Sequence, residues 1–303
     1  MYPVMNSASK ANGILFVLVL AAMFVYSLPP VFSFARTQTD TWNLFVDGKL
    51  LRKFEQAYDK RFFLREPSVE LWADDQFKLF GEGTKGVVLG KQGWLYTNQE
   101  YRVPNDLQAN LNTQLEQIAK IKTQLAEHGK QLVILPLPMK LDVYAEHAQH
   151  RFDPRVVSLY DDFVGELQAR QLDVVPLRGA FLSKLNGPEL FLKSDTHWSP
   201  DGARLADFEL ARQRPQLVGD QAYVSHKAGE KSVKGDLMNY IQFDHNRLAP
   251  QFGPNQIDLY ETLKAEQSSD DLFAEQEQSL LLVGTSYSKI DDWNFVGFLK
   301  EAL

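Results

Sequence analysis

The segment 106–138, DLQANLNTQLEQIAKIKTQLAEHGKQLVILPLP, carries the pattern that decides the fold. Apolar residues recur at spacings of three and four over 106–128, which predicts an amphipathic helix that ends at Gly129. The apolar run that follows, 131–135, is closed by prolines at 136 and 138, and such a run is typical of a strand buried on both faces. A helix that leads into a buried strand is the repeating unit of an α/β fold.

The same alternation returns along the rest of the chain. The predicted elements are helices over 159–169, 200–212 and 293–303, strands over 172–175 and 280–283, and a strand–turn–strand unit over 86–96. Together they predict an α/β fold with a mainly parallel central sheet. The more polar segment 214–279 is interpreted as an insertion or loop layer.

Composition narrows the class of protein before any motif is considered. The 303 residues include no cysteine, 44% hydrophobic residues and a formal net charge of -7. The lack of cysteine excludes disulfide frameworks, thiolate nucleophiles and cysteine-ligated metal sites. The acidic balance argues against a nucleic-acid partner, because the sequence offers no basic stripe to contact phosphates.

An uncharged apolar stretch near the N-terminus, ANGILFVLVLAAMFVYSL over 11–28, decides the compartment. It reaches the short end of a membrane-spanning helix, roughly 17–20 residues, and exceeds the apolar core of a cleaved signal peptide, about 7–15 residues. We interpret 1–36 as an uncleaved signal-anchor; the alternatives are a cleaved signal and a buried core helix. Residues 37–85 then form a juxtamembrane helical region, and 86–303 form the main domain.

The turn VGTSYS over 283–288 is the first candidate for chemistry. A serine on a tight strand-to-helix turn is exposed above a parallel sheet, and Gly284 permits the sharp turn. Backbone N–H groups that enter the next helix can stabilise an oxyanion. Ser286 is therefore a candidate nucleophile; the alternative is that this Ser/Thr-rich turn only caps a helix.

The segment SDTHWSP over 194–200 is the second candidate. Residues i and i+2 of an extended segment point to the same side, so Asp195 can accept from Nδ1 of His197 and leave Nε2 as a base. The alternatives are a metal site, for which a third nearby histidine is missing, and an aspartate that caps the next helix. A serine needs a base and the base needs an orienting group, so we predict a triad without metal or cofactor. The other histidines are interpreted as structural or solvent-facing: His128, His147, His150, His226 and His245.

Six segments in combination resemble the alginate O-acetyltransferase AlgJ/AlgX family. They are SDTHWSPDGA (194–203), VGTSYS (283–288), WNFVGFLKEAL (293–303), GVVLGKQGWLY (86–96), KLDVY (140–144) and KGDLMNY (234–240). The N-terminal anchor is more similar to AlgJ-like than to AlgX-like members. The resemblance implies an SGNH-hydrolase-like three-layer α/β domain with a permuted motif order, in which the Asp–His pair precedes the serine.

The resemblance also implies a function. Asp195, His197 and Ser286 match the family's catalytic residues, which implies a periplasmic O-acetyltransferase that uses a serine acetyl-enzyme on alginate or a related exopolysaccharide. The implied partners are an AlgI-like membrane-bound O-acyltransferase as acetyl donor and other subunits of an acetylation complex, at the periplasmic side of the inner membrane. The family's domain is longer, so the chain is expected to be truncated at its C-terminus.

Several finer expectations follow. The sequence lacks the G-x-N-D of ordinary SGNH hydrolases, so backbone N–H groups around Ser286 are the expected oxyanion donors, with Asn239 or Asn294 as alternatives. Tyr287, Trp198 and Lys140 are expected to bind substrate, although a solvated lysine is the plainer interpretation of Lys140.

Two rival functions stay open. One is an SGNH-type acetylesterase, in which water takes the acetyl group. The other is a non-catalytic polysaccharide-binding or assembly subunit, in which aromatic side chains stack on sugar rings rather than fill a core. The aromatic residues in question are Trp94, Tyr96, Tyr101, Trp198 and Trp293.

Overall fold

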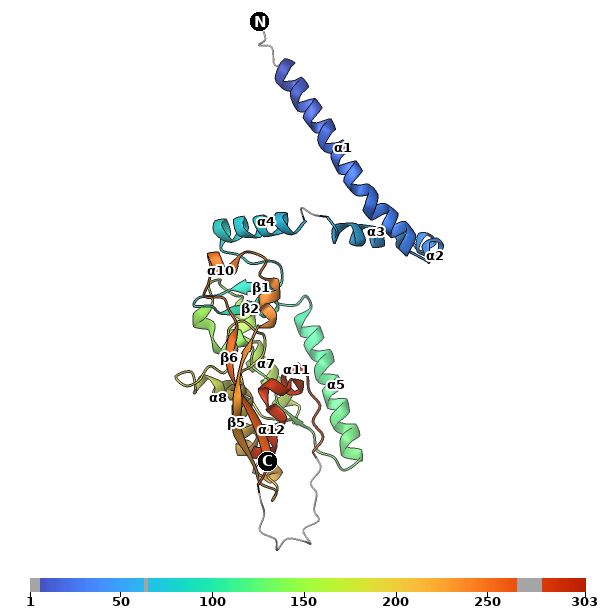
Figure 1. The fold of residues 1–303 in the computed structure, drawn as a ribbon. Coiled ribbons are helices and arrows are strands. Elements are labelled where there is room, and N and C mark those ends of the chain that lie inside the picture. Colours follow the sequence, from blue (N-terminus) through green and yellow to red (C-terminus); the bar gives the residue numbers. More distant parts are fainter. Residues whose placement is uncertain (1–5, 63–64, 266–279) are drawn as a thin grey trace. The chain divides into compact units, whose positions relative to one another are not determined.

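The computed structural model describes residues 6–62, 65–265 and 280–303. The chain divides into two compact units, Met1–Trp72 and Ala73–Leu303. Helix α4 (Arg65–Phe80) runs across the boundary between them. Figure 1 shows the elements of each unit in the order of the sequence.

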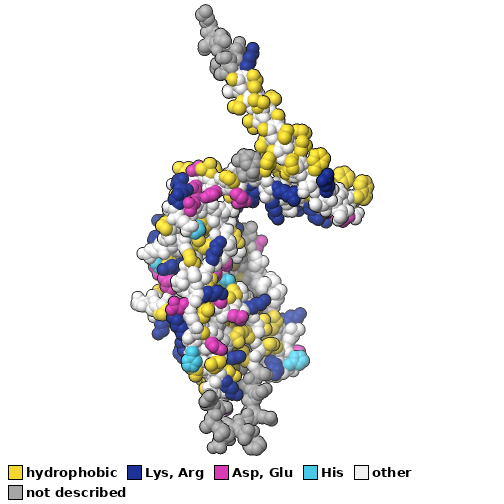
Figure 2. All heavy atoms as spheres, in the orientation of Figure 1, with side chains coloured by type: hydrophobic (Ala, Val, Ile, Leu, Met, Phe, Trp, Pro, Cys, Tyr) yellow, Lys and Arg dark blue, Asp and Glu magenta, His cyan; other side chains and the backbone are white. Residues whose placement is uncertain are grey.

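The first unit is built on one long apolar helix, α1 (Asn6–Thr37). Its stretch Lys10–Thr37 is long and apolar enough to cross a membrane, a test that a signal sequence also passes. Apolar side chains cover it on the face seen in Figure 2, and none of its most apolar window is buried. The helix therefore fits the predicted membrane anchor or a signal, and the core-helix alternative is wrong.

Two short helices, α2 (Thr41–Val46) and α3 (Leu50–Asp59), complete the first unit. The rings of Phe34 and Phe54 bring α1 and α3 together with their centroids 5.4 Å apart. Closer to the middle of α1, Ser27 Oγ lies 2.7 Å from Tyr58 Oη. α3 therefore packs along the C-terminal half of α1 and leaves the first half of that helix uncovered.

The second unit contains the β-hairpin that the pattern around Gly93 predicts. β1 (Val87–Leu89) pairs antiparallel with β2 (Leu95–Thr97). Gly93 turns the chain with φ of +85°, and a Cβ at this position would collide with the carbonyl oxygen of Gln251. Both the turn and the neighbouring backbone therefore require glycine.

The segment that decides the fold, 106–138, holds one helix and the first strand of a β–α–β unit. α5 (Leu107–Glu127) confirms the first predicted helix and leads into β3 (Val133–Ile134). β3 pairs parallel with β4 (Asp173–Val174), which follows α7 (Pro154–Ala169). Burial on both faces was wrong for β3, whose residues are half-buried, because β4 is its one strand neighbour among the described residues. Parallel pairing in the described parts of the chain is limited to this pair.

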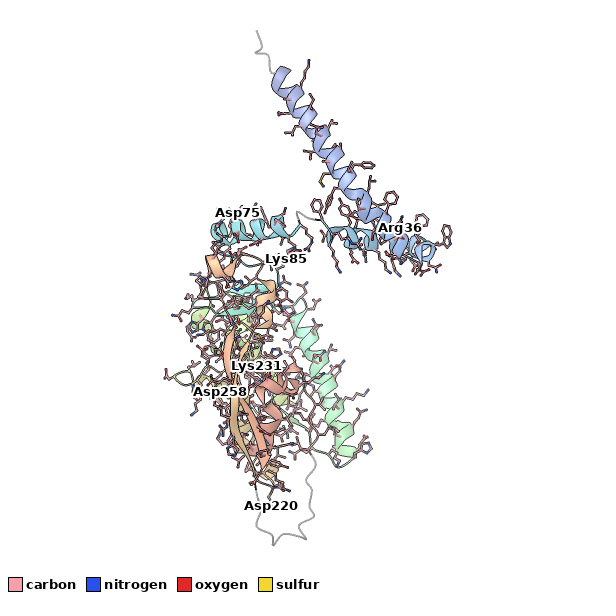
Figure 3. The ribbon with its side chains drawn as sticks, viewed as in Figure 1. Arg36, Asp75, Lys85, Asp220, Lys231 and Asp258 are labelled. Atoms are coloured by element: carbon pink, nitrogen blue, oxygen red, sulfur yellow. The ribbon has the colours of Figure 1, made fainter. Side chains whose placement is uncertain are left out.

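Of the two interpretations of 214–279, an insertion or a loop layer, the loop layer is wrong, because the segment holds the longest strands of the described chain. β5 (Tyr223–Val233) and β6 (Asn255–Lys264) form an antiparallel ribbon. Its polar residues include Lys231 and Asp258, labelled in Figure 3, whose side chains are 49% and 44% exposed. A two-stranded ribbon with one face in solvent needs polar side chains there, so polarity was a misleading signal. Residues 266–279 lie outside the described residues.

The main core lies where α9 (Pro200–Gln213), α12 (Phe295–Ala302) and the β5–β6 ribbon meet (Figure 1). Trp198 and Phe295 stack in it with ring centroids 5.2 Å apart. This core ties the segment before α9 to the segment before α12, and these two segments carry the predicted triad. The remaining elements are η1 (Asn98–Tyr101), α6 (Lys140–Val143), η2 (Ala145–His147), α8 (Arg178–Leu182), η3 (Pro215–Leu217), η4 (Asp236–Tyr240), α10 (His245–Leu248), α11 (Ser286–Lys289) and η5 (Asp291–Trp293).

The predicted buried strand over 280–283 is also wrong. These residues form no strand, and Leu281 and Val283 are 87% and 86% exposed. An apolar run becomes a buried strand only where a neighbouring strand pairs with it and a second layer covers it. In the described part of the chain, β3 pairs with β4 alone and leaves this run without a partner. The turn at Ser286 thus follows an extended, exposed segment.

Candidate active site

The Asp–His pair lies in a tight loop that enters α9. The N–H of Leu192 donates to the carbonyl of His197 at 3.2 Å, and the N–H of Ser199 donates to the carbonyl of Leu190 at 3.0 Å. These bonds fold 190–199 back on itself and fix the loop between them. Ser199 then caps α9, because its side chain accepts the N–H of Gly202 at 3.2 Å.

Asp195 and His197 make the contact that the i, i+2 spacing predicts. Oδ1 of Asp195 lies 2.6 Å from Nδ1 of His197 and also accepts the His197 backbone N–H at 2.9 Å. Both residues are buried, at 5% and 9% exposure. Burial raises the pKa of Asp195, but hydrogen bonds from the His197 ring, the His197 N–H and the Asp236 N–H outweigh it and hold this pKa below its ordinary value. Asp195 is therefore ionised and orients the imidazole.

Ser286, which is distant in sequence from the Asp–His pair, lies within hydrogen-bond distance of His197. It is the first residue of α11, and its Oγ lies 2.8 Å from Nε2 of His197. Ser286 itself is exposed, so its hydroxyl is open to a reactant. The candidate nucleophile, the candidate base and the carboxylate beside it thus lie in the order that acyl transfer requires.

Asp236 contacts the candidate triad, a position that sequence reasoning missed. Its backbone N–H donates to Oδ2 of Asp195 at 2.8 Å, and its carboxylate accepts both the N–H of Thr196 at 2.8 Å and the hydroxyl of Thr196 at 2.6 Å. The preceding Gly235 lies so close to the carbonyl of Ser194 that a Cβ would collide with it. The stretch 234–240 carried a family resemblance, but no spacing rule links it to a loop forty residues away.

Comparisons with known proteins show which family the chain belongs to. A family model described as "SGNH hydrolase-like domain, acetyltransferase AlgX" matches residues 87–303. The chain belongs to this SGNH hydrolase-like acetyltransferase family.

Relatives with a curated name extend the match over most of the chain. A protein named probable alginate O-acetylase AlgJ from Pseudomonas fluorescens is 34% identical over 298 residues, which cover 95% of this chain and 74% of that protein. The protein of the same name from Pseudomonas aeruginosa is 36% identical over 276 residues, which cover 85% and 69%. These matches confirm the resemblance that the six sequence segments carried.

Solved structures of the family show the same fold. The O-acetyltransferase domain of Pseudomonas putida AlgJ superposes with a TM-score of 0.63 at 29% identity and covers 72% of this chain and 76% of that one. Pseudomonas aeruginosa AlgX superposes with a TM-score of 0.54 at 21% identity and covers 71% and 52%, a likeness of fold alone. The predicted SGNH-hydrolase-like α/β class is therefore confirmed.

The three residues predicted to bind substrate lie beside the triad but have other contacts. Trp198 is 1% exposed and its indole N–H donates to the carbonyl of Tyr287 at 3.1 Å, so it is a core residue. The Tyr287 hydroxyl donates to the carbonyl of Thr196 at 2.6 Å, and its ring centroid lies 4.8 Å from that of His197. Tyr287 therefore links the nucleophile helix to the Asp–His loop; burial raises its pKa.

Lys140 is not at the surface, which corrects both interpretations of it. The side chain is 1% exposed, and its Nζ donates to the carbonyl oxygens of Leu192, Lys193 and Asp195. A lysine whose donors all point inward cannot reach a uronate carboxylate.

The alternative oxyanion donors are not favoured by their contacts. The side chain of Asn294 donates to Thr262 Oγ1 at 3.0 Å, which ties it to the β5–β6 ribbon, and Asn239 is exposed on η4. The aromatic residues proposed to stack on sugars are mostly core residues: Trp94, Tyr96, Trp198 and Trp293 are at most 2% exposed, and Tyr101 is half-buried. Of the other histidines, His147 stacks on Trp94 with centroids 5.0 Å apart, a structural contact.

Asp195, His197 and Asp236 also place one potential metal-ligand atom each within 4.8 Å of one another. Hydrogen bonds already account for both carboxylate oxygens of Asp195 and of Asp236, and both ring nitrogens of His197 lie on the triad. A metal would have to displace the Asp–His contact that orients the base. These residue contacts fit a triad better than a metal centre.

Proposed function

We propose that this chain is an alginate O-acetyltransferase that works through a serine acetyl-enzyme. The observation that carries the proposal is the continuous path from Asp195 Oδ1 through His197 to Ser286 Oγ, with steps of 2.6 and 2.8 Å. Membership of the acetyltransferase family supports acetyl as the transferred group, and the relatives named alginate O-acetylase support alginate as the acceptor.

The reaction runs in two half-reactions through the same base. In the first, Nε2 of His197 takes the proton of Ser286 as Oγ attacks the acetyl carbonyl; the acetyl–donor bond breaks, and the leaving group takes the proton back from His197. In the second, His197 takes a proton from a mannuronate hydroxyl, whose oxygen attacks the acetyl-serine. Ser286 leaves with that proton, and acetylated polymer is the product. Asp195 stabilises the imidazolium in both.

The negative charge of each tetrahedral adduct needs donors near Ser286. The N–H groups of Ser286 and Tyr287 open α11, so they have no acceptor within that helix. We assign the oxyanion to these backbone groups. The exposure of Ser286 leaves room for a polymer to approach the acetyl-enzyme from solvent.

The donor and the location belong to the same proposal. α1 anchors the chain in the inner membrane with the acetyltransferase domain in the periplasm, where an AlgI-like membrane-bound O-acyltransferase supplies the acetyl groups. The uncovered first half of α1 and the apolar length of Lys10–Thr37 support the anchor. Retention of the full chain in membranes after an alkaline carbonate wash tests it, and release into the supernatant contradicts it.

Replacement of Ser286 tests the chemistry. Ser286→Ala removes the nucleophile, and we expect acetyl transfer to oligomannuronate to fall by at least about 10³-fold. Ser288→Ala is the matched control, because Ser288 lies in the same short helix and donates to the carbonyl of Thr285 at 3.1 Å instead of to His197. Mass spectrometry of wild-type protein incubated with a chromogenic acetate should show an acetyl group on Ser286. Undiminished transfer by Ser286→Ala would favour a non-catalytic subunit.

The same assay separates transferase from esterase. Acetylated oligomannuronate in the wild-type reaction supports transfer. Acetate release without any acetylated sugar means that water is the acceptor, and the chain is then an acetylesterase.

A further inference from the structure

A lysine lies buried beneath the loop that carries the Asp–His pair. Lys140 comes from α6, more than fifty residues away in sequence, and its Nζ lies 3.1, 3.3 and 2.6 Å from the carbonyl oxygens of Leu192, Lys193 and Asp195. An ammonium has three donors, so this side chain is fully used by one stretch of backbone. The shortest contact is to Asp195 itself.

Aromatic rings and acidic groups around this ammonium offset part of the cost of its burial. Nζ lies 5.9 and 5.5 Å from the ring centroids of Trp94 and Tyr96, which form aromatic walls around it. Glu100 is the buried counter-charge, and its carboxylate accepts the N–H of Leu141 at 2.7 Å and the N–H of Thr97 at 3.1 Å. Glu100 therefore holds the start of α6, from which Lys140 reaches the loop.

We propose that Lys140 is a positioning residue for acetyl transfer: its ammonium gathers the backbone of 192–195 and so holds Asp195 in place for His197. Three carbonyl oxygens that point to one spot repel each other, and they need a cation or a set of donors between them. Without the ammonium the loop relaxes, and the 2.6 Å contact between Asp195 and His197 lengthens. The inference rests on the proposed acetyl chemistry of the triad.

The charge of Lys140 makes this support dependent on pH. The charged groups that face it are Glu100 on η1, Asp195 on the loop and Asp236 on η4, and each favours the ammonium. Burial opposes them and lowers the pKa of Lys140 from its ordinary value of 10.5 to about 8. Above that pH the amine has two donors for three carbonyls and no charge. Activity should therefore decline on the alkaline side as Lys140 loses its proton.

Lys140→Met is the direct test, because methionine is of similar length and carries no donor. We expect kcat to fall by about 10- to 100-fold, with KM changed by less than about threefold, because the loop touches the base rather than the substrate. The alkaline limb of the kcat/KM profile should disappear from the remaining activity. Hydrogen exchange read by mass spectrometry should speed up in 192–197, a readout that needs no activity.

Glu100→Gln is a second test of the role of Lys140, and it can be used even if Lys140→Met fails to fold. It removes the counter-charge that favours the ammonium, so the alkaline limb should move to lower pH. Lys193→Met is the matched control: Lys193 belongs to the same loop and its carbonyl stays in place, but its side chain pairs with Glu189 at the surface at 2.8 Å. This control should keep the wild-type profile and the wild-type exchange rates.

The outcomes separate this inference from the proposed function. A wild-type protein without Ser286-dependent activity overturns the proposed function. The role of Lys140 is overturned if the wild type is active and Glu100→Gln shows the same decline of kcat/KM at alkaline pH as the wild type. The same holds for Lys140→Met where that variant folds. A uniform loss of kcat in Lys140→Met without a change in profile or in the exchange of 192–197 also contradicts it.

Discussion

The backbone N–H of Asp236 lies 2.8 Å from Oδ2 of Asp195, the carboxylate oxygen that faces away from the His197 ring. Oδ1 is thereby left for Nδ1 of His197, and the carboxylate cannot rotate without the loss of a hydrogen bond. The Asp236 side chain holds Thr196, the residue between the two members of the pair, through both its N–H and its hydroxyl. The orienting carboxylate is therefore itself oriented, by a segment that follows β5.

Replacement of the Asp236 side chain should lower kcat and spare KM. Asp236→Ala keeps the N–H to Asp195 but removes both acceptors of Thr196. Because Asp195 itself stays bonded, we expect kcat to lose the equivalent of one hydrogen bond to a charged group, about 1.5–3 kcal/mol, and so to fall roughly 10- to 150-fold. Asp236→Asn keeps one acceptor and should lie between Ala and the wild type. Steady-state kinetics with a chromogenic acetate would measure the series.

Asp220→Ala is the control for that series, since Asp220 is an exposed aspartate elsewhere on the same unit (Figure 3). It should leave kcat unchanged. Equal activity of Asp236→Ala and Asp220→Ala would show that the loop needs no clamp.

Tyr287→Phe should weaken the link between the nucleophile helix and the Asp–His loop. The change removes the hydroxyl that donates to the carbonyl of Thr196 at 2.6 Å and keeps the ring against His197. One neutral hydrogen bond contributes about 1 kcal/mol, so kcat should fall by about fivefold and the free energy of unfolding by about 1 kcal/mol. Tyr240→Phe, at a tyrosine that is 46% exposed, is the control. A larger effect from the control than from Tyr287→Phe would contradict the link.

The triad could be predicted from sequence because short local patterns mark each of its residues. The i, i+2 spacing of Asp195 and His197 fixes their mutual direction, and the glycine-containing turn marks Ser286. The helices were equally accessible, since the apolar spacing of 106–128 and Pro200 at the first turn of α9 are local signals.

The predictions that were wrong concern residues whose burial or contacts depend on segments far away in the sequence, and no local pattern reports such contacts. The run 280–283 reads as a buried strand, yet burial depends on whether a neighbour covers it. Lys140 reads as a surface residue, because the three carbonyls that bind it come from a loop more than fifty positions later. Asp236 acts partly through its backbone N–H, a group that every residue except proline has.

The pKa of Lys140 predicts that its contribution to the free energy of unfolding rises between pH 8 and 10.5, whereas activity is expected to fall over the same range. The folded pKa of about 8 lies below the unfolded value of 10.5, so the unfolded chain binds more protons between these pH values. Stability rises with pH wherever the unfolded state binds more protons, and this shift corresponds to about 3 kcal/mol. The difference in free energy of unfolding between wild type and Lys140→Met, followed by urea denaturation in detergent, should grow from pH 8 to 10.5. A constant difference over that range would mean that Lys140 keeps its ordinary pKa.

The exposed aromatic residues of α2 predict contact with the membrane surface beside the proposed anchor. Trp42 is 74% exposed and Phe45 is 63% exposed in a short helix that directly follows α1, and their rings stack with centroids 6.0 Å apart. Tryptophan concentrates at membrane–water interfaces, where its apolar body and its N–H are both accommodated. In liposomes that contain lipids brominated near the headgroup, the full chain should lose part of its tryptophan fluorescence.

The variant Trp42→Phe identifies the source of that loss. Trp94, Trp198 and Trp293 are buried in the second unit, so lipid bromines reach them poorly. Trp42 and Trp72 are 74% and 68% exposed, so wild type and variant are compared in a Trp72→Phe background, in which Trp42 should supply much of the quenched signal. The quenched fraction should therefore drop in Trp42→Phe, whereas liposomes of unbrominated lipid give no quenching in either protein. If the quenched fraction is the same in wild type and variant, α2 does not rest on the bilayer and its aromatic residues face water or another protein.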